Sequence, residues 1–127
     1  MIVENKHIDF QGLLDGLHYL YYYEVVRHEY FATLGKSVED FHKDGINLVL
    51  TSCNELNYKK SIIKDDELEI TCEIIPVSKA KFGFYQKILV NNKVVSDAKF
   101  HATAVNVAGG RPFIPDNIKK ELEKLNI

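Results

Sequence analysis

The stretch YLYYYEVVRHEYFATL, residues 19–34, has the periodicity of an amphipathic helix and limits the folds that the rest of the chain can adopt. Its apolar and aromatic positions recur three and four residues apart, the spacing that places side chains on one face of a helix. Gly35 follows directly and can end a helix in the left-handed conformation. We therefore expect one long helix from about Tyr19 to Leu34. Its stripe consists of Tyr19, Tyr22, Tyr23, Val26 and Tyr30, with Glu24, Arg27 and His28 largely off it.

The chain changes its period after a short second helix. Ser37 and Asp40 stand three residues apart and form a weak capping pair, and Gly45 ends the helix. From Ile46 onward apolar and polar residues alternate, which is the pattern of a strand with one buried face. In DELEITCEI, residues 66–74, the alternation is clearest, and Pro76 then indicates a bend or an edge position.

Two further long strands are predicted from KFGFYQKILV, residues 81–90, and KVVSDAKFHATAVNV, residues 93–107. Asn91 and Asn92 join them and tolerate positive φ, so a two-residue hairpin turn fits. NIKKELEKL, residues 117–125, forms a short charged helix at the end. A helix stripe followed by four long antiparallel strands is best buried against one concave sheet face. We expect an α+β hotdog fold, in which a curved antiparallel sheet of five or more strands wraps around one central helix. Other α+β layouts satisfy the same constraints.

Composition excludes several classes of protein. The chain has 127 residues, 46% hydrophobic and 27% charged, which suits one globular domain over residues 1–127. A net charge of -2 argues against nucleic acid as the main partner. We expect no signal peptide and no membrane span. Cys53 and Cys72 are interpreted as buried, reduced thiols of a cytoplasmic protein.

Five sequence blocks follow one another along the chain: DFQG at Asp9–Gly12, HYLYYYEVVRHEYF at His18–Phe31, NYKKSIIKDD from Asn57, SKAKF at Ser78–Phe82 and GRPFIP at Gly110–Pro115. Together they resemble the hotdog-fold acyl-CoA thioesterases, in the 4-hydroxybenzoyl-CoA thioesterase-like branch. The resemblance implies hydrolysis of an acyl-CoA to a free acid and coenzyme A, with no cofactor other than the coenzyme A of the substrate. It also implies a cytoplasmic homodimer or dimer of dimers with sites between subunits.

Asp9 matches the catalytic aspartate of that family. Thioester hydrolysis needs a carboxylate that attacks the carbonyl or takes a proton from water, and donors for the oxygen that becomes negative. A helix N-terminus offers such donors, and the family's backbone donor falls on Gly16. Alternatively, Asp9 only caps a turn at Gly12. His18 either caps the helix or contacts the acyl carbonyl or Asp9, and capping is favoured.

Other candidates bind the two ends of the substrate. The Tyr side chains of the helix either line an acyl tunnel or belong to the core. Glu24 and Arg27, three residues apart, are expected to form an ion pair on the helix surface or at a subunit interface. The substrate candidates are Gly12, Tyr19, Tyr22, Tyr23 and Tyr58, and the coenzyme A candidates are Lys59, Lys60, Lys79, Lys81 and Arg111.

Three hypotheses about the function remain open from the sequence alone. The first is an acyl-CoA thioesterase, the second a thioesterase acting on an acyl carrier protein, and the third a catalytically weak acyl-CoA binding protein. The sequence contains no nucleophile elbow, no phosphate-binding glycine loop and no pair of His for a metal. For dimerisation we expect the strand after Ser78 to offer its edge, because it is long and free of proline.

Overall fold

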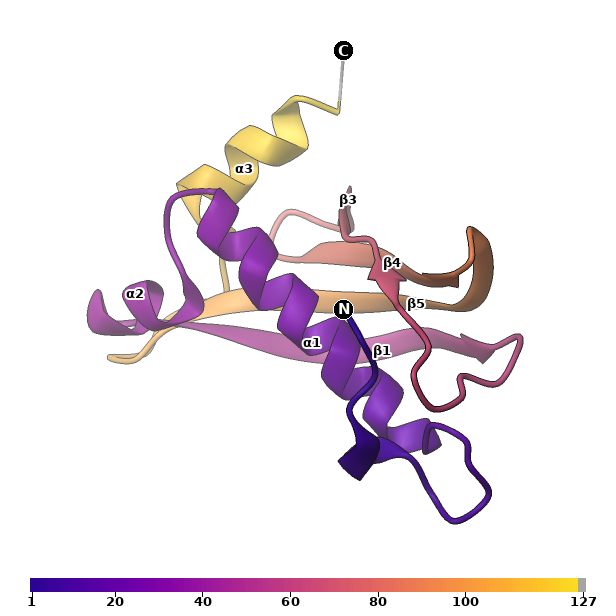
Figure 1. The fold of residues 1–127 in the computed structure, drawn as a ribbon. Helices are drawn as coiled ribbons and strands as arrows, with labels where there is room; N and C mark the ends of the chain where they lie inside the picture. Colours follow the sequence, from indigo (N-terminus) through magenta and orange to yellow (C-terminus); the bar gives the residue numbers. More distant parts are fainter. Residues whose placement is uncertain (126–127) are drawn as a thin grey trace.

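A five-stranded antiparallel sheet curves around one long helix in the computed structural model, which describes residues 1–125 (Figure 1). This is the predicted hotdog arrangement. The helices are η1 (Asn5–His7), α1 (Gly16–Thr33), α2 (Val38–Lys43) and α3 (Asp116–Glu123), and the strands are β1 (Ile46–Tyr58), β2 (Glu69–Ile70), β3 (Glu73–Pro76), β4 (Phe82–Val90) and β5 (Lys93–Asn106).

Helix α1 begins at Gly16, three residues before the predicted start at Tyr19. The cap is Asp15, whose side chain accepts a hydrogen bond from the Leu17 N–H. The prediction that His18 caps the helix is therefore wrong, because Asp15 offers a short acceptor one residue before the first helical position. The predicted end is confirmed, since Gly35 has a φ of 91°. The Ser37–Asp40 capping box at α2 is also confirmed.

The sheet has the order β1-β5-β4-β2, and β3 also pairs with β4. The hairpin between β4 and β5 turns at Asn91 and Asn92, whose φ values of 52° and 62° confirm the predicted positive φ. Strand β1 pairs with β5 on one side only and is interrupted by irregularities between Leu50 and Ser52 and between Cys53 and Glu55. Strand β1 is thus the long free edge of the sheet.

Two predictions about strands are wrong. Residues 66–74 do not form one long strand, because β2 and β3 are separated at Thr71 and Cys72, although the alternating burial holds. Strand β4, predicted to offer a free edge, lies inside the sheet between β5 and the β2–β3 segment. A strand without proline is compatible with either position, and only its neighbours decide. Pro76 does end the edge strand β3.

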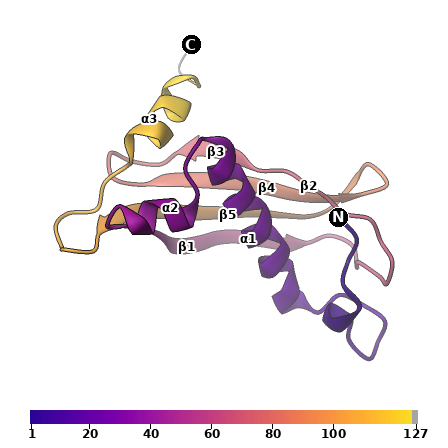
Figure 2. The ribbon, with the colours of Figure 1, turned by 60° about the vertical axis from the view of Figure 1, so that its left-hand side comes forward.

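The core consists of two apolar clusters along α1, which crosses the concave face of the sheet (Figure 2). The first contains Tyr19, Tyr22 and Tyr23, and the second contains Phe31 and residues of α3. Between them, Arg27 Nη1 donates to Gln86 Oε1 over 3.1 Å, and both side chains are buried. The prediction that Arg27 lies largely off the buried stripe is therefore wrong.

The two cysteines are free thiols. Burial raises the pKa of the half-buried Cys72 to about 12. Cys53 is exposed on β1, so its predicted burial is wrong, because β1 has no neighbour on its outer side. Among residues 1–125, no helix is both long and apolar enough to cross a membrane.

Candidate functional site

Asp9 lies on a tight hairpin that leads directly into α1. Ile8 pairs with Leu14, and the Asp9 N–H donates to the Leu13 carbonyl over 2.8 Å. Asp9 Oδ1 accepts from the Gln11 N–H over 2.8 Å and from the Leu13 N–H over 3.3 Å. Gly12, with a φ of 80°, allows the chain to turn back. The carboxylate therefore caps its own turn, as the alternative interpretation expected. The loop that carries it runs into the N-terminal end of α1 (Figure 1).

Gly16 is the first residue of α1, and its N–H has no acceptor inside the helix. Tyr58 Oη donates to the Gly16 carbonyl over 3.0 Å and packs edge-on against Tyr19, with ring centroids 4.7 Å apart. A cavity of about 300 Å³ opens here. It is lined by Leu14, Gly16, Tyr19, Tyr58, Lys59, Lys60 and Ser61. The fold thus brings together five of the predicted site residues.

Lys59 and Lys60 sit at the mouth of this first cavity but differ in their partners. Lys59 Nζ lies 3.0 Å from Asp97 Oδ2, and Asn57 donates to the other oxygen of the same carboxylate over 2.7 Å. Hydrogen bonds from Asn57 and Lys59 lower the pKa of Asp97. Within residues 1–125, Lys60 has no carboxylate within 4.0 Å. It is the freer of the two cations for a phosphate.

Lys79, Lys81 and Arg111 lie at the opposite end of the sheet. Ala80 accepts a hydrogen bond from Thr103 on β5, and Phe113 pairs with Ala104. Tyr58, by contrast, pairs with Ser96 at the other end of β5. Seven strand residues separate these positions, which is roughly 20 Å or more. One chain therefore does not gather the predicted coenzyme A residues into a single rim.

Tyr22 and Tyr23 belong to the core, not to the wall of a cavity. Both are fully buried, with 1% and 0% of their surface exposed. Tyr22 Oη accepts from the Glu4 N–H over 2.9 Å and lies 2.7 Å from His7 Nδ1, while Tyr23 Oη donates to Ser96 Oγ over 2.7 Å. Both residues therefore belong to the core, and of the three predicted helix tyrosines only Tyr19 borders the first cavity.

His18 lies in the first turn of α1 and stacks on His7, with ring centroids 4.3 Å apart. Its Nδ1 is sealed from solvent and has no hydrogen-bond partner among residues 1–125. The sequence did not single out His7, because nothing in its local pattern indicates burial. It is nevertheless only 7% exposed and closes the base of the Asp9 hairpin, where its carbonyl accepts from the Asp15 N–H.

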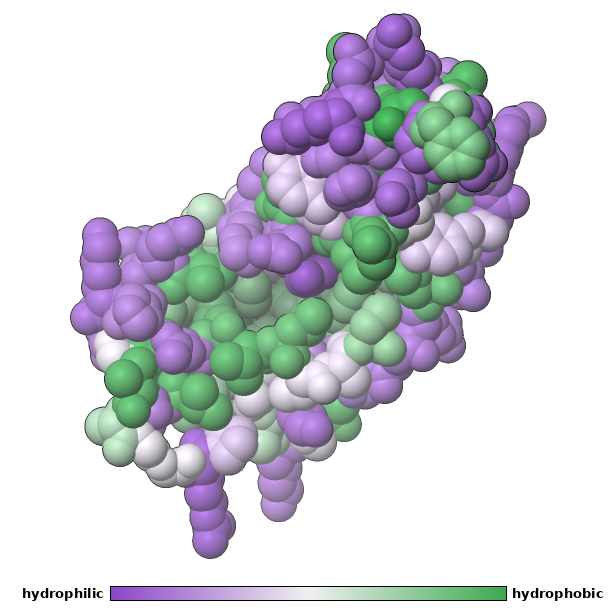
Figure 3. Space-filling model, turned by 90° about the horizontal axis from the view of Figure 1, so that it is seen from below, coloured by the Kyte–Doolittle hydropathy of each residue, from purple (hydrophilic) through white to green (hydrophobic). Residues whose placement is uncertain are grey.

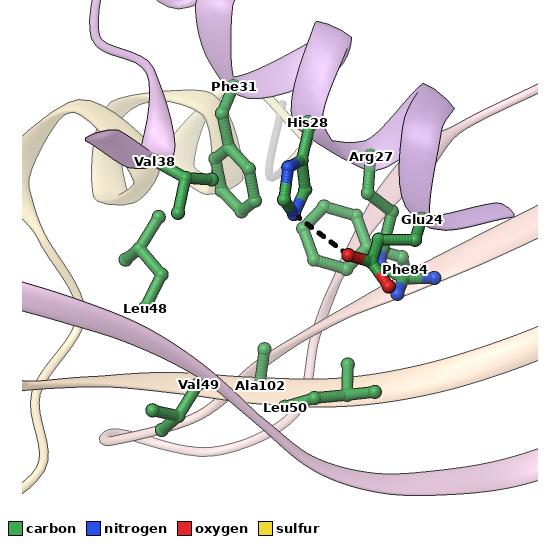
Figure 4. Close-up of a pocket in the computed structure, with 10 residues that line it drawn as sticks. All are labelled: Glu24, Arg27, His28, Phe31, Val38, Leu48, Val49, Leu50, Phe84 and Ala102. Carbon is green, nitrogen blue, oxygen red and sulfur yellow. Dashed lines mark ion pairs between the residues drawn. The ribbon is translucent and has the colours of Figure 1, made fainter. Parts of the chain in front are cut away.

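A second cavity of about 210 Å³ lies between α1, α2 and the sheet (Figure 4). Its polar side chains all come from α1. Glu24 pairs with His28 over 3.8 Å, so the predicted pairing of Glu24 with Arg27 is wrong: Arg27 turns under the helix toward Gln86. The sequence did not indicate this cavity, because its walls come from distant segments. They are Phe31, Val38, Leu48, Val49, Leu50, Phe84 and Ala102.

A family model described as the thioesterase-like superfamily matches residues 3–122. No curated protein matches the chain significantly. Among solved structures, the fold is similar to a hypothetical protein from Aquifex aeolicus, with a TM-score of 0.88, 24% identity and coverage of 96% of this chain and 95% of that one. It is also similar to the DHNA-CoA thioesterase from Staphylococcus aureus (TM-score 0.86, 21% identity, 99% and 89% covered). The 1,4-dihydroxy-2-naphthoyl-CoA thioesterase from Synechocystis superposes at a TM-score of 0.88, with 14% identity and 100% and 95% covered.

Proposed function

Because the chain belongs to the thioesterase-like superfamily and is a thioester hydrolase, we propose that it converts an acyl-CoA into the free acid and coenzyme A. The observation that carries this proposal is the hairpin of Ile8 to Leu14. It carries the Asp9 carboxylate on the segment that leads into α1 at Gly16, where backbone N–H groups have no helical partner.

In this proposal Asp9 supplies the base or the nucleophile. Oδ1 holds the turn, whereas Oδ2 has no hydrogen-bond partner within the described part of the chain. Oδ2 either takes a proton from the attacking water or attacks the thioester carbon itself. The carbonyl oxygen becomes negative as the new C–O bond forms, and the Gly16 N–H at the positive end of the helix dipole stabilises it. The C–S bond then breaks, and the thiolate of coenzyme A takes up a proton. Where water attacked, the free acid forms directly; where Asp9 attacked, a second step follows in which water hydrolyses the acyl–Asp9 anhydride, releasing the acid and restoring the carboxylate.

Coenzyme A binding requires two copies of the chain in this proposal. Antiparallel pairing of two β1 edges would place the Tyr58 end of one copy beside the Ile46 end of the other. Lys79, Lys81 and Arg111 lie at that second end of each sheet. The pairing would bring them toward the first cavity and Lys60, forming a rim for the phosphates. Free cysteines are consistent with the cytoplasmic location that we propose.

Asp9→Asn tests the chemistry. The change keeps the shape of the side chain and an oxygen for the turn, but it removes the base. We expect kcat on an acyl-CoA to fall by about 10² or more, the usual scale for a general base, with little change in ligand affinity. A colour assay for released thiol measures turnover, and calorimetry with a non-hydrolysable analogue measures affinity. Full turnover in this variant would move the chemistry away from Asp9.

His18→Asn is the companion variant. If His18 only packs against His7, the change lowers the free energy of unfolding and leaves kcat nearly unchanged. A large loss of kcat at unchanged stability would make the imidazole a participant in the reaction. Both variants are measured on the same panel of acyl-CoA substrates.

A further inference from the structure

The second cavity contains a buried cation that lacks an anionic partner. Arg27 is 8% exposed, and no carboxylate within residues 1–125 lies within 4.0 Å of it. Its guanidinium lies over the Phe100 ring, 4.2 Å from the centroid, and Nη1 donates to Gln86. Burial lowers the pKa of Arg27, against an opposing effect of Glu24. A guanidinium has five N–H donors, so with Gln86 Oε1 as its one acceptor within residues 1–125 most of them lack a partner.

The remaining donors are not shut away in the protein interior. Within residues 1–125, the only buried side-chain nitrogen or oxygen atoms without a hydrogen-bond partner are His18 Nδ1 and Asn117 Nδ2. Nitrogens of Arg27 without a partner are therefore not sealed inside the core. Arg27 lines the cavity, and Figure 4 shows its side chain descending from α1 on the side where Glu24 and Phe84 are drawn. Its unpartnered nitrogens are therefore the donors available to a ligand there.

Glu24 does not satisfy this cation. It pairs with His28, and the two side chains are 60% and 47% exposed, so their pair stands at the solvent rim. Below the rim the walls are apolar, formed by side chains such as Phe31, Leu48 and Leu50. The cavity therefore combines an apolar body with one unpaired positive charge at depth. A buried charge is costly unless it is paired.

We propose that this cavity is a binding site for a small carboxylic acid with an apolar body, whose carboxylate pairs with Arg27. A planar carboxylate matches the fork of a guanidinium in two parallel hydrogen bonds. An apolar cavity of roughly 150 Å³ holds a benzene ring, so about 210 Å³ suits a single ring or a short aliphatic chain with its carboxylate.

The site is separate from the Asp9 hairpin. Arg27 stands eleven residues along α1 from Gly16, which is roughly 16 Å at the rise of an α-helix. Carboxylic acids are also the class of product that thioester hydrolysis releases. The cavity therefore binds acids of the product class at a distance from the bond that is cleaved.

Calorimetric titration of the full chain with benzoate and with benzamide tests the site. The two ligands share a ring and differ in charge. We expect benzoate to bind once per subunit and about tenfold or more tightly than benzamide, the scale of a charged hydrogen-bonded pair. In Arg27→Met, which keeps an apolar stem, the preference for benzoate should disappear. Asp9→Asn should bind benzoate as the unmodified chain does, which keeps this result independent of the proposed hydrolysis.

Ala102→Leu provides a second variant that leaves Arg27 intact. Ala102 lines the cavity, and a larger side chain there should abolish benzoate binding by filling the space. Circular dichroism verifies that each variant is folded. If Arg27→Met does not fold, benzoate binding by Ala102→Leu tests the site in its place. Three results would overturn the proposal: no benzoate binding, equal binding of benzoate and benzamide, or unchanged benzoate binding in a folded variant of either kind.

Discussion

At the scale of single residues, the phenol of Tyr22 connects α1 to the segment before Asp9. Tyr22 Oη accepts from the Glu4 N–H and lies 2.7 Å from His7 Nδ1, so one phenol hydrogen-bonds to both residues. Tyr22→Phe leaves the partly buried Glu4 N–H and the buried His7 Nδ1 without this partner, and we expect the free energy of unfolding to fall by about 1–3 kcal/mol. Urea denaturation measures the change. Tyr21→Phe, a half-exposed neighbour on the same helix, is the control and should change stability far less.

His7 should also make the stability depend on pH. Burial lowers its pKa from the ordinary 6.5, followed by the charge of His18, while Glu4 opposes the shift. The folded state then binds the proton less readily than the unfolded chain. Stability is therefore fully present above about pH 6.5 and decreases as the pH falls below it. Urea denaturation between pH 5 and 8 should show this slope, and His7→Gln should flatten it.

The exposed His42 supplies the control for this slope, since His42→Gln should leave it intact. An unchanged slope in His7→Gln would assign the pH dependence to other groups.

Single residues also show the limits of sequence. The turn at Asp9 and Gly12 was predictable, because Asp and Gly favour turns through contacts and dihedral angles that involve only a few neighbouring residues. The burial of His7 and Arg27 was not, because each depends on partners far along the chain, such as Gln86. The same holds for the separation of Lys59 from Lys81, which only the sheet topology determines.

At the scale of elements, Gly83 fixes how closely β4 approaches its neighbours. A Cβ built there would lie 2.9 Å from Ile75 Cγ1 and 3.0 Å from both the Phe100 carbonyl oxygen and Val77 Cγ2. The carbonyl belongs to the backbone of β5 and cannot move aside. We expect Gly83→Ala to cost about 1–3 kcal/mol of unfolding free energy, measured by thermal or urea denaturation.

Gly16→Ala is the matched control for that substitution. Its Cβ would meet only Tyr58, at 3.6 and 3.7 Å, which is ordinary contact. Alanine also suits a helix better than glycine, so stability should change by less than about 1 kcal/mol. Equal losses in the two variants would contradict the crowding argument.

The elements themselves were largely predictable from periodicity. Local interactions within a few consecutive residues determine three of them: the end of α1, the capping box of α2 and the turn at Asn91 and Asn92. The pairing of strands is not determined locally: a window over residues 81–90 cannot show that β2 and β3 both lie against β4. The position of the free edge was therefore predicted wrongly.

At the scale of the whole molecule, the exposed apolar surface beside β1 predicts self-association. Leu50 is 50% exposed, and Figure 3, which views the molecule from the side of β1, shows apolar residues around a hollow. We expect light scattering to find a dimer at micromolar concentration and Leu50→Glu to shift it to monomer, since a buried charge opposes the contact. Leu125→Glu, at a similarly exposed position after α3, should leave the dimer intact.

The two edges of the sheet differ greatly in length, and this difference limits copy number. A protein with two long open edges polymerises, because each added copy exposes another site for the next. Here β1 offers 13 residues, whereas the opposite edge consists of the two residues of β2 and the four of β3, which end in a proline. Once two β1 edges have joined, only these short, interrupted edges remain outward. Association by strand addition would stop at the dimer. Raising the protein concentration would increase the fraction of chains in dimers without producing longer assemblies.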